Sequence, residues 1–224
     1  MEHRRKLSVA SMFSVYFAGE LFSGKHLLGN AALAAAIGQV SNLQFICVIP
    51  QTFEPRNPGP KSIRDEDLVN LVSCDLAIFN FDGPELDSGT VAEFMFARFA
   101  DIPSLLLRTD FRRGGDQAAE PWNLMLSFYP QTKTLCLNSM EIYKLSIGRD
   151  RSPVNAGKSM VDSVAAAIIK ELEMLSQFPP IMTCELIEPV FRWISKLAGF
   201  QSSETIEKVM AAFTNRKGKL MPPE

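Results

Sequence analysis

The stretch that decides the fold begins with an apolar run, Leu76-Ala77-Ile78-Phe79-Asn80-Phe81, and continues as Asp82-Gly83-Pro84-Glu85-Leu86-Asp87-Ser88-Gly89-Thr90-Val91-Ala92-Glu93. A helical pattern follows through residues 94–100. The order predicts a strand, an acidic turn and a helix. In open parallel α/β sheets, ligands bind just beyond the carboxyl ends of the strands, where such turns lie. The turn is therefore the first place to expect a site.

Four other stretches predict strands, and helical patterns separate most of them. The predicted strands are residues 12–18, 45–49, 75–81, 104–107 and 132–137, with helices at about 25–39 and 62–73 and after the acidic turn. Alternating strands and helices indicate βαβ units and a parallel sheet. Five strands favour a flavodoxin-like doubly wound α/β fold.

The pattern changes near residue 150. Residues 149–153 are polar and predict a linker, and helices follow at 161–175, 186–197 and 204–213. We therefore predict a catalytic domain over 1–148 and a helical C-terminal extension over 149–224. The extension is expected to cap the core or a subunit interface, and its basic residues 216–219 are interpreted as solvated.

Composition narrows the class of protein. The chain has 224 residues and a formal net charge of −2, which gives no indication of nucleic-acid or membrane-surface binding. Residues 1–6 are basic, but no signal-peptide pattern follows, so a cytoplasmic location is expected. Four widely spaced cysteines and two histidines favour neither a zinc site nor a disulfide framework. The chain also lacks the glycine patterns of dinucleotide and nucleoside triphosphate sites.

Glu93 stands on a small and apolar helix face, with Gly89, Thr90, Phe96 and Ala97 three and four residues away. A carboxylate there loses hydration, which raises its pKa and is typical of functional sites. Alternatively, Glu93 reaches solvent or pairs with a cation such as Arg98. Asp87 and Ser88 could likewise be simple helix N-caps.

The pattern Asp87-Ser88-Gly89-Thr90-x-x-Glu93, after an apolar strand and Asp82-Gly83, resembles the active-site signature of the nucleoside 2-deoxyribosyltransferase family. Further segments match in the family's order: Val15-Tyr16-Phe17-Ala18-Gly19, residues 63–75, residues 107–112 and Asn123-Leu124-Met125-Leu126. The resemblance covers roughly the first two-thirds of the chain, and it implies the same flavodoxin-like fold.

The resemblance implies a transferase that exchanges the base of a 2′-deoxyribonucleoside, as in purine and pyrimidine salvage, through a covalent deoxyribosyl-glutamate. Glu93 matches the nucleophile, Tyr16 a tyrosine that holds it, and Asp67 an acid that faces the base. Without the resemblance, Tyr16 could be an ordinary strand tyrosine and Asp67 a surface charge. The partners would be nucleosides and free nucleobases, with no metal or organic cofactor.

The resemblance also implies substrate contacts. Related monophosphate N-glycosidases carry a serine six residues before the nucleophile, whereas Asp87 stands there and favours nucleosides over nucleotides. Asn123 matches a residue that reaches the 5′-hydroxyl from a neighbouring subunit, which implies a homo-oligomer, although it could also be an N-cap. The remaining expected contacts are Gly19, Phe22, Glu54, Asp82 and Gly89, with Asp82 equally readable as a turn former.

Two alternatives use the same residues. A nucleoside or nucleotide N-glycosidase would share Glu93 and release the base to water. A non-catalytic nucleoside sensor would keep the pocket and act through its helical extension.

Overall fold

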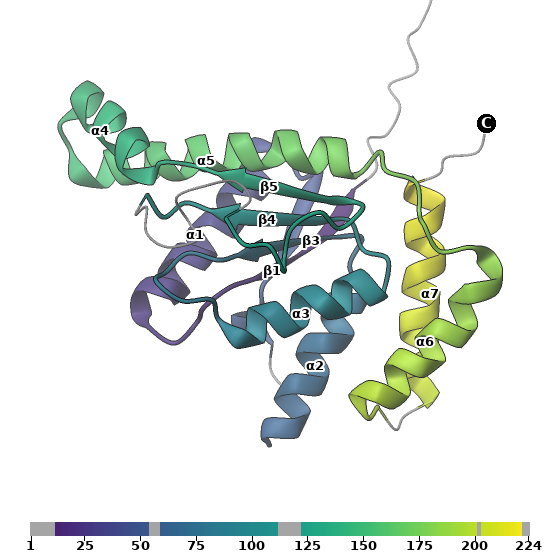
Figure 1. Ribbon diagram of the computed structural model, residues 1–224. Coiled ribbons are helices and arrows are strands. Elements are labelled where there is room, and N and C mark those ends of the chain that lie inside the picture. The colour runs from purple at the N-terminus through teal and green to yellow at the C-terminus, as the bar shows by residue number, and fades with distance from the viewer. Residues whose placement is uncertain (1–11, 54–58, 112–121, 201–202, 221–224) are drawn as a thin grey trace, which may run out of the picture.

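The computed structural model describes residues 12–53, 59–111, 122–200 and 203–220 (Figure 1). Within these ranges, one parallel sheet forms from β1 (Phe13–Ala18), β2 (Phe45–Val48), β3 (Leu76–Asn80), β4 (Ser104–Arg108) and β5 (Thr132–Cys136). The strand order β2-β1-β3-β4-β5 is that of flavodoxin-like proteins. The predicted fold class is confirmed.

Helices cover both faces of the sheet. One face carries α1 (Gly24–Val40) and α5 (Pro153–Leu175), and the other carries α2 (Pro60–Ser73) and α3 (Ser88–Phe99) (Figure 1). The short 3-10 helix η1 (Pro50–Thr52) follows β2. The remaining helices are α4 (Ser139–Asp150), α6 (Cys184–Ala198) and α7 (Ser203–Leu220).

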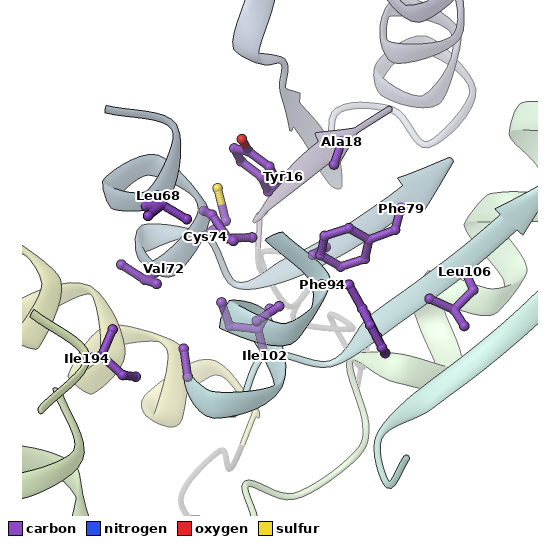
Figure 2. Packing of buried hydrophobic residues seen from close by; sticks show 14 of the residues in the cluster. Tyr16, Ala18, Leu68, Val72, Cys74, Phe79, Phe94, Ile102, Leu106 and Ile194 are labelled. Atoms are coloured by element: carbon purple, nitrogen blue, oxygen red, sulfur yellow. The ribbon is translucent and has the colours of Figure 1, made fainter. Parts of the chain in front are cut away.

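The central strands β1, β3 and β4 are largely apolar because helices bury both faces of the sheet there, whereas the edge strand β5 is partly exposed. In β1, Val15 and Phe17 lie in the cluster with α1 and α5, whereas Tyr16 and Ala18 lie in the cluster with α2 and α3. Figure 2 shows the second cluster, in which Phe94 of α3 lies beside Phe79 of β3. Tyr16 is thereby the one buried hydroxyl-bearing aromatic on the α2–α3 side among the described core residues.

The C-terminal half differs from the sequence prediction in two ways. Helix α4 was not expected. Helix α5 begins at Pro153 rather than near 161, because the Ser152 side chain caps the Asn155 amide and proline suits the first helical turn. Six buried residues of α5 pack in the core cluster that it shares with α1. The domain boundary at residues 148/149 stays a prediction.

The prediction of a solvated basic tail is wrong. Arg216 is only 2% exposed, stacks over the Phe213 ring at 4.9 Å, and donates to the Cys74 carbonyl oxygen at 3.2 Å. Lys219 pairs with Asp75 at 2.6 Å. These contacts hold α7 against the amino end of β3. The short basic motif by itself does not show them, because it does not reveal what covers each face of the helix.

None of the helices in the described ranges combines the length and apolarity needed to span a bilayer.

Candidate active site

Helix α3 starts at the acidic turn because Asp87 caps it. Asp87 Oδ2 accepts hydrogen bonds from the Thr90 amide at 2.7 Å and from the Thr90 hydroxyl at 2.8 Å. A Cβ at Gly89 would lie 3.1 Å from the same oxygen, so glycine gives the carboxylate its room. The N-cap interpretation of Asp87 is confirmed. Among the described residues, its other oxygen, Oδ1, accepts no hydrogen bond and stays available.

One turn into α3, Glu93 meets Tyr16 from the end of β1. The Tyr16 hydroxyl donates to Glu93 Oε1 at 2.6 Å. Arg98, the alternative partner, instead donates to the Pro130 carbonyl oxygen and the Ser104 hydroxyl, both at 2.8 Å. Pairing of Glu93 with Arg98 is therefore excluded, and a strand tyrosine holds the carboxylate.

Burial sets the protonation of this pair. It raises the pKa of Glu93 to about 7, with the Tyr16 hydrogen bond opposing and the charges of Asp67 and Asp87 adding to the rise. Burial, followed by the negative charge of Glu93, raises the pKa of Tyr16 well above its ordinary value, so the phenol stays a donor. Glu93 can thus change charge near neutral pH.

The pKa of Asp67 is also raised, to about 6, first by burial and then by the charge of Glu66. Asp67 stands on α2 and lines the same pocket as Glu93 of α3. Two carboxyl groups with raised pKa values therefore share one concave site, a combination typical of acid–base and nucleophilic chemistry.

A pocket of about 510 Å³ lies at the carboxyl edge of the sheet between α2, α3 and the loop after β1. It brings together six of the predicted site residues: Gly19, Phe22, Asp67, Asp87, Gly89 and Glu93. Tyr16 stands directly behind Glu93 through their hydrogen bond. Gly19 permits the close approach of β1 and β3, since a Cβ there would lie 3.2 Å from Asn80 Cβ.

Besides Tyr16, two predicted residues within the described ranges do not line this pocket, Asp82 and Asn123. Asp82 lines a separate pocket of about 280 Å³ on the α1–α5 side, and its carboxylate accepts from the Thr109 amide and hydroxyl and the Asp110 amide. This placement favours the turn-former interpretation. Asn123 Oδ1 caps its own turn by accepting from the Met125 and Leu126 amides at 3.0 and 3.1 Å. Glu54 lies outside the described residues.

Sequence reasoning missed several residues of the pocket wall, notably Leu21, Ile63, Arg64 and Phe96. Helical spacing could have indicated three of them. Ile63 and Arg64 precede Asp67 by one turn, and Phe96 follows Glu93 by three residues. Leu21 sits in an irregular loop and gives no such signal.

The described residues contain no group of three His, Cys, Asp or Glu side chains placed to hold a metal ion. The chemically reactive side chains of the site are carboxyl groups and one phenol, and the rest of its wall is mostly apolar. A doubly wound α/β sheet with a tyrosine-bound carboxylate at its carboxyl edge is typical of enzymes that act on small molecules.

Comparison with known proteins supplies the family. Residues 15–125 match the family described as nucleoside 2-deoxyribosyltransferase, and the chain belongs to this family. The matched segment contains Tyr16, Asp67, Asp87 and Glu93. Membership supports a deoxyribosyltransferase-type function. No protein of curated function matches the chain.

Among solved structures, the chain is similar to a conserved protein from Enterococcus faecalis V583, at 22% identity over 73% of this chain and 99% of that one, with a TM-score of 0.46. It is similar to a 2-deoxyribosyltransferase from Bacillus psychrosaccharolyticus at 14% identity, covering 52% and 93%, with a TM-score of 0.39. For a 2-desoxiribosyltransferase from Leishmania mexicana the values are 21%, 62% and 99%, with a TM-score of 0.43.

Proposed function

We propose that this protein exchanges the nucleobase of 2′-deoxyribonucleosides by double displacement through Glu93. The observation that carries the proposal is the 2.6 Å hydrogen bond from Tyr16 to Glu93 Oε1 at the wall of the pocket. It fixes one carboxylate oxygen. The other, Oε2, has no hydrogen-bond partner within the described part of the chain and is free to attack.

In the first half-reaction, Glu93 Oε2 forms a bond to C1′ of the sugar as the bond from C1′ to the base nitrogen breaks. The electron pair of the broken bond leaves with the base, which takes a proton from Asp67. The transition state resembles an oxocarbenium ion, and a carboxylate stabilises it and then traps it. The intermediate is a deoxyribosyl ester of Glu93.

In the second half-reaction, a nitrogen of the incoming base attacks C1′. The ester electron pair returns to Glu93, and the proton lost by the incoming base returns to Asp67. The apolar wall residues Leu21, Phe22, Ile63, Leu68 and Phe96 suit the flat faces of a base and limit access of water.

Asp87 sets the proposed preference for nucleosides. Its free Oδ1 can accept a hydrogen bond from a 5′-hydroxyl, whereas the negative charge of a 5′-phosphate would be repelled. Replacing Asp87 with Ser keeps a helix cap and removes the charge. We expect Asp87→Ser to lower turnover of deoxynucleosides about tenfold and to raise turnover of their monophosphates relative to them.

The test is to incubate the protein with deoxyinosine, with and without free adenine. Deoxyadenosine formed only when adenine is present supports exchange, and Glu93→Ala should abolish it. Hypoxanthine released equally fast without adenine, with no deoxyadenosine, would make the protein a hydrolase. Intact-protein mass spectrometry during turnover should find a deoxyribosyl adduct in the native chain and none in Glu93→Ala.

We further propose that Asn123 serves the site of a neighbouring subunit in a homo-oligomer. The adjacent side chains Leu124 and Met125 are 73% and 76% exposed, as an unpaired contact surface would be. Mixing Glu93→Ala with Asn123→Ala tests this, because a mixed dimer would hold one site with both residues intact. Regained activity would support a site shared between subunits. A mixture that stays inactive would mean that Asn123 does not serve the site of a neighbouring subunit.

A further inference from the structure

The pocket wall that leads to Asp67 is the first half of α2. Pro60, Ile63 and Arg64 line the pocket from this half, and Asp67 and Leu68 line it from the middle of the helix. The buried residues of α2, Leu68, Leu71 and Val72, all lie in its second half. The first half also starts at Gly59 without a side-chain cap. Burial in the core therefore fixes α2 from Leu68 onward, whereas the turns before it contain no buried residue.

The first half is attached instead to the end of α6. Arg64 Nη2 donates to the Ala198 carbonyl oxygen at 2.6 Å, and Lys61 Nζ reaches the Gly199 carbonyl oxygen at 3.5 Å. Helix α6 ends there with Gly199 in the left-handed region, at φ 75°. The last carbonyl groups of a helix lack intrahelical partners and carry partial negative charge, so cations bind there favourably.

Asp65 orders the two cations. It pairs with Lys61 Nζ at 2.6 Å and accepts from Arg64 Nε at 3.0 Å. Helix α2 also packs against α7. Helix α7 in turn lies beside α6 (Figure 1). Helix α7 therefore supports both α2 and α6. We name the contacts of Lys61, Arg64 and Asp65 with residues 198–199 the α2–α6 clamp.

We propose that Arg64 is a positioning residue, which through the α2–α6 clamp holds the wall that carries Asp67 and so makes the C-terminal helices part of the active site. Its effect on turnover rests on the proposed function. Helices α6 and α7 lie outside the segment that matches the family, so this support belongs to the chain's own C-terminal part. It gives the extension a role in base recognition that it fulfils without contacting the base.

Arg64 also lines the pocket, so a direct contact with the substrate must be distinguished from positioning. A substrate contact would leave the free helix unchanged, and its loss would add independently to the loss of Asp67. A positioning residue acts through Asp67, so the two losses should not add. The test uses both properties.

The first measurement is hydrogen–deuterium exchange of residues 62–67 in the full-length protein without substrate. We expect exchange in Arg64→Gln to be at least tenfold faster than in the native chain, with partial protection in Arg64→Lys. The matched control is Arg192→Gln, which removes an exposed arginine paired with Glu188 on α6 and should leave α2 unchanged. Unchanged exchange in Arg64→Gln would overturn the proposal.

The second measurement is a double-mutant cycle on kcat with Asp67→Asn. We expect Arg64→Gln to lower kcat about tenfold in the native chain and less than twofold in the Asp67→Asn background. Equal effects in both backgrounds, or a change in KM alone, would overturn the positioning role. If even the native protein fails to exchange bases, the proposed function is wrong. Hydrogen–deuterium exchange then still tests the α2–α6 clamp, and the affinity for adenine replaces kcat in the double-mutant cycle.

Discussion

The Tyr16 hydroxyl lies 2.6 Å from Glu93 Oε1, and the two residues come from a strand and a helix 77 positions apart. Tyr16 is fully buried and its pKa is raised, so the phenol donates and the carboxylate accepts. This hydrogen bond lowers the pKa of Glu93 against the larger effect of burial. It favours the ionised carboxylate that a nucleophile needs.

Tyr16→Phe removes that hydrogen bond with almost no change in shape. We expect kcat/KM to fall roughly 10- to 100-fold, since a hydrogen bond to a charged group contributes about 1.5–3 kcal/mol. The pKa of Glu93 should rise, so the acid limb of the pH–rate profile should move to higher pH. A profile with an unmoved acid limb would contradict this role for the phenol.

Glu93→Gln should stabilise the folded protein at alkaline pH. The folded pKa of Glu93, about 7, is above its ordinary value of 4.5, so folding binds a proton between those limits. The destabilising effect of Glu93 is therefore absent well below pH 4.5 and complete above about pH 7. We expect Glu93→Gln to gain about 1 kcal/mol at pH 8, after allowance for solvent screening, and nothing at pH 4.

Thermal unfolding of the native chain and Glu93→Gln at both pH values checks this linkage. Glu188→Gln, an exposed residue of α6, is the control and should show no pH-dependent gain. Equal melting temperatures at pH 8 would mean that burial of the ionised Glu93 carboxylate does not destabilise the folded protein.

Asp67→Asn should remove the basic limb of the pH–rate profile. The acid form of Asp67 is lost as the pH rises through about 6, whereas an amide has no such titration. Turnover should also fall about 100-fold, the usual scale of general acid catalysis. Glu66→Gln should move the native basic limb to lower pH, because the charge of Glu66 raises the pKa of Asp67. An intact basic limb in Asp67→Asn would assign the proton to another group.

Gly89→Ala should damage the site through Asp87. The added Cβ would lie 3.1 Å from Asp87 Oδ2, so the capping carboxylate must move. We expect about 1 kcal/mol of lost stability and about a tenfold lower kcat/KM for deoxynucleosides. Gly157→Ala in α5, where a Cβ meets nothing within 4 Å, is the matched control and should be neutral or stabilising. Full activity in Gly89→Ala would refute the steric argument.

Arg216→Ala tests the docking of α7. It removes a buried guanidinium that stacks on Phe213 and donates to the Cys74 carbonyl oxygen. We expect a loss of about 3 kcal/mol in the free energy of unfolding, measured by chemical denaturation, because both a cavity and an unpaired acceptor result. Lys208→Ala, exposed on the same helix, should cost less than about 0.5 kcal/mol. Equal losses would mean that α7 is not anchored by Arg216.

The sequence by itself determined the sheet and most of the pocket. Apolar runs buried on both faces read directly as parallel strands, and their alternation with helices left few topologies open. The acidic turn marked the start of α3, and a carboxylate on an apolar helix face marked Glu93. These are local signals, carried by residues within one or two turns of each other.

Only the tertiary structure decided which residues meet across the fold. It paired Glu93 with Tyr16 rather than Arg98, turned Asp82 toward the other face of the sheet, and buried Arg216 in a segment that looked solvated. It also joined Arg64 to the end of α6, 134 residues away. Hydrogen-bond partners and burial depend on how distant elements pack, because a side chain's periodicity gives its face but not what covers that face.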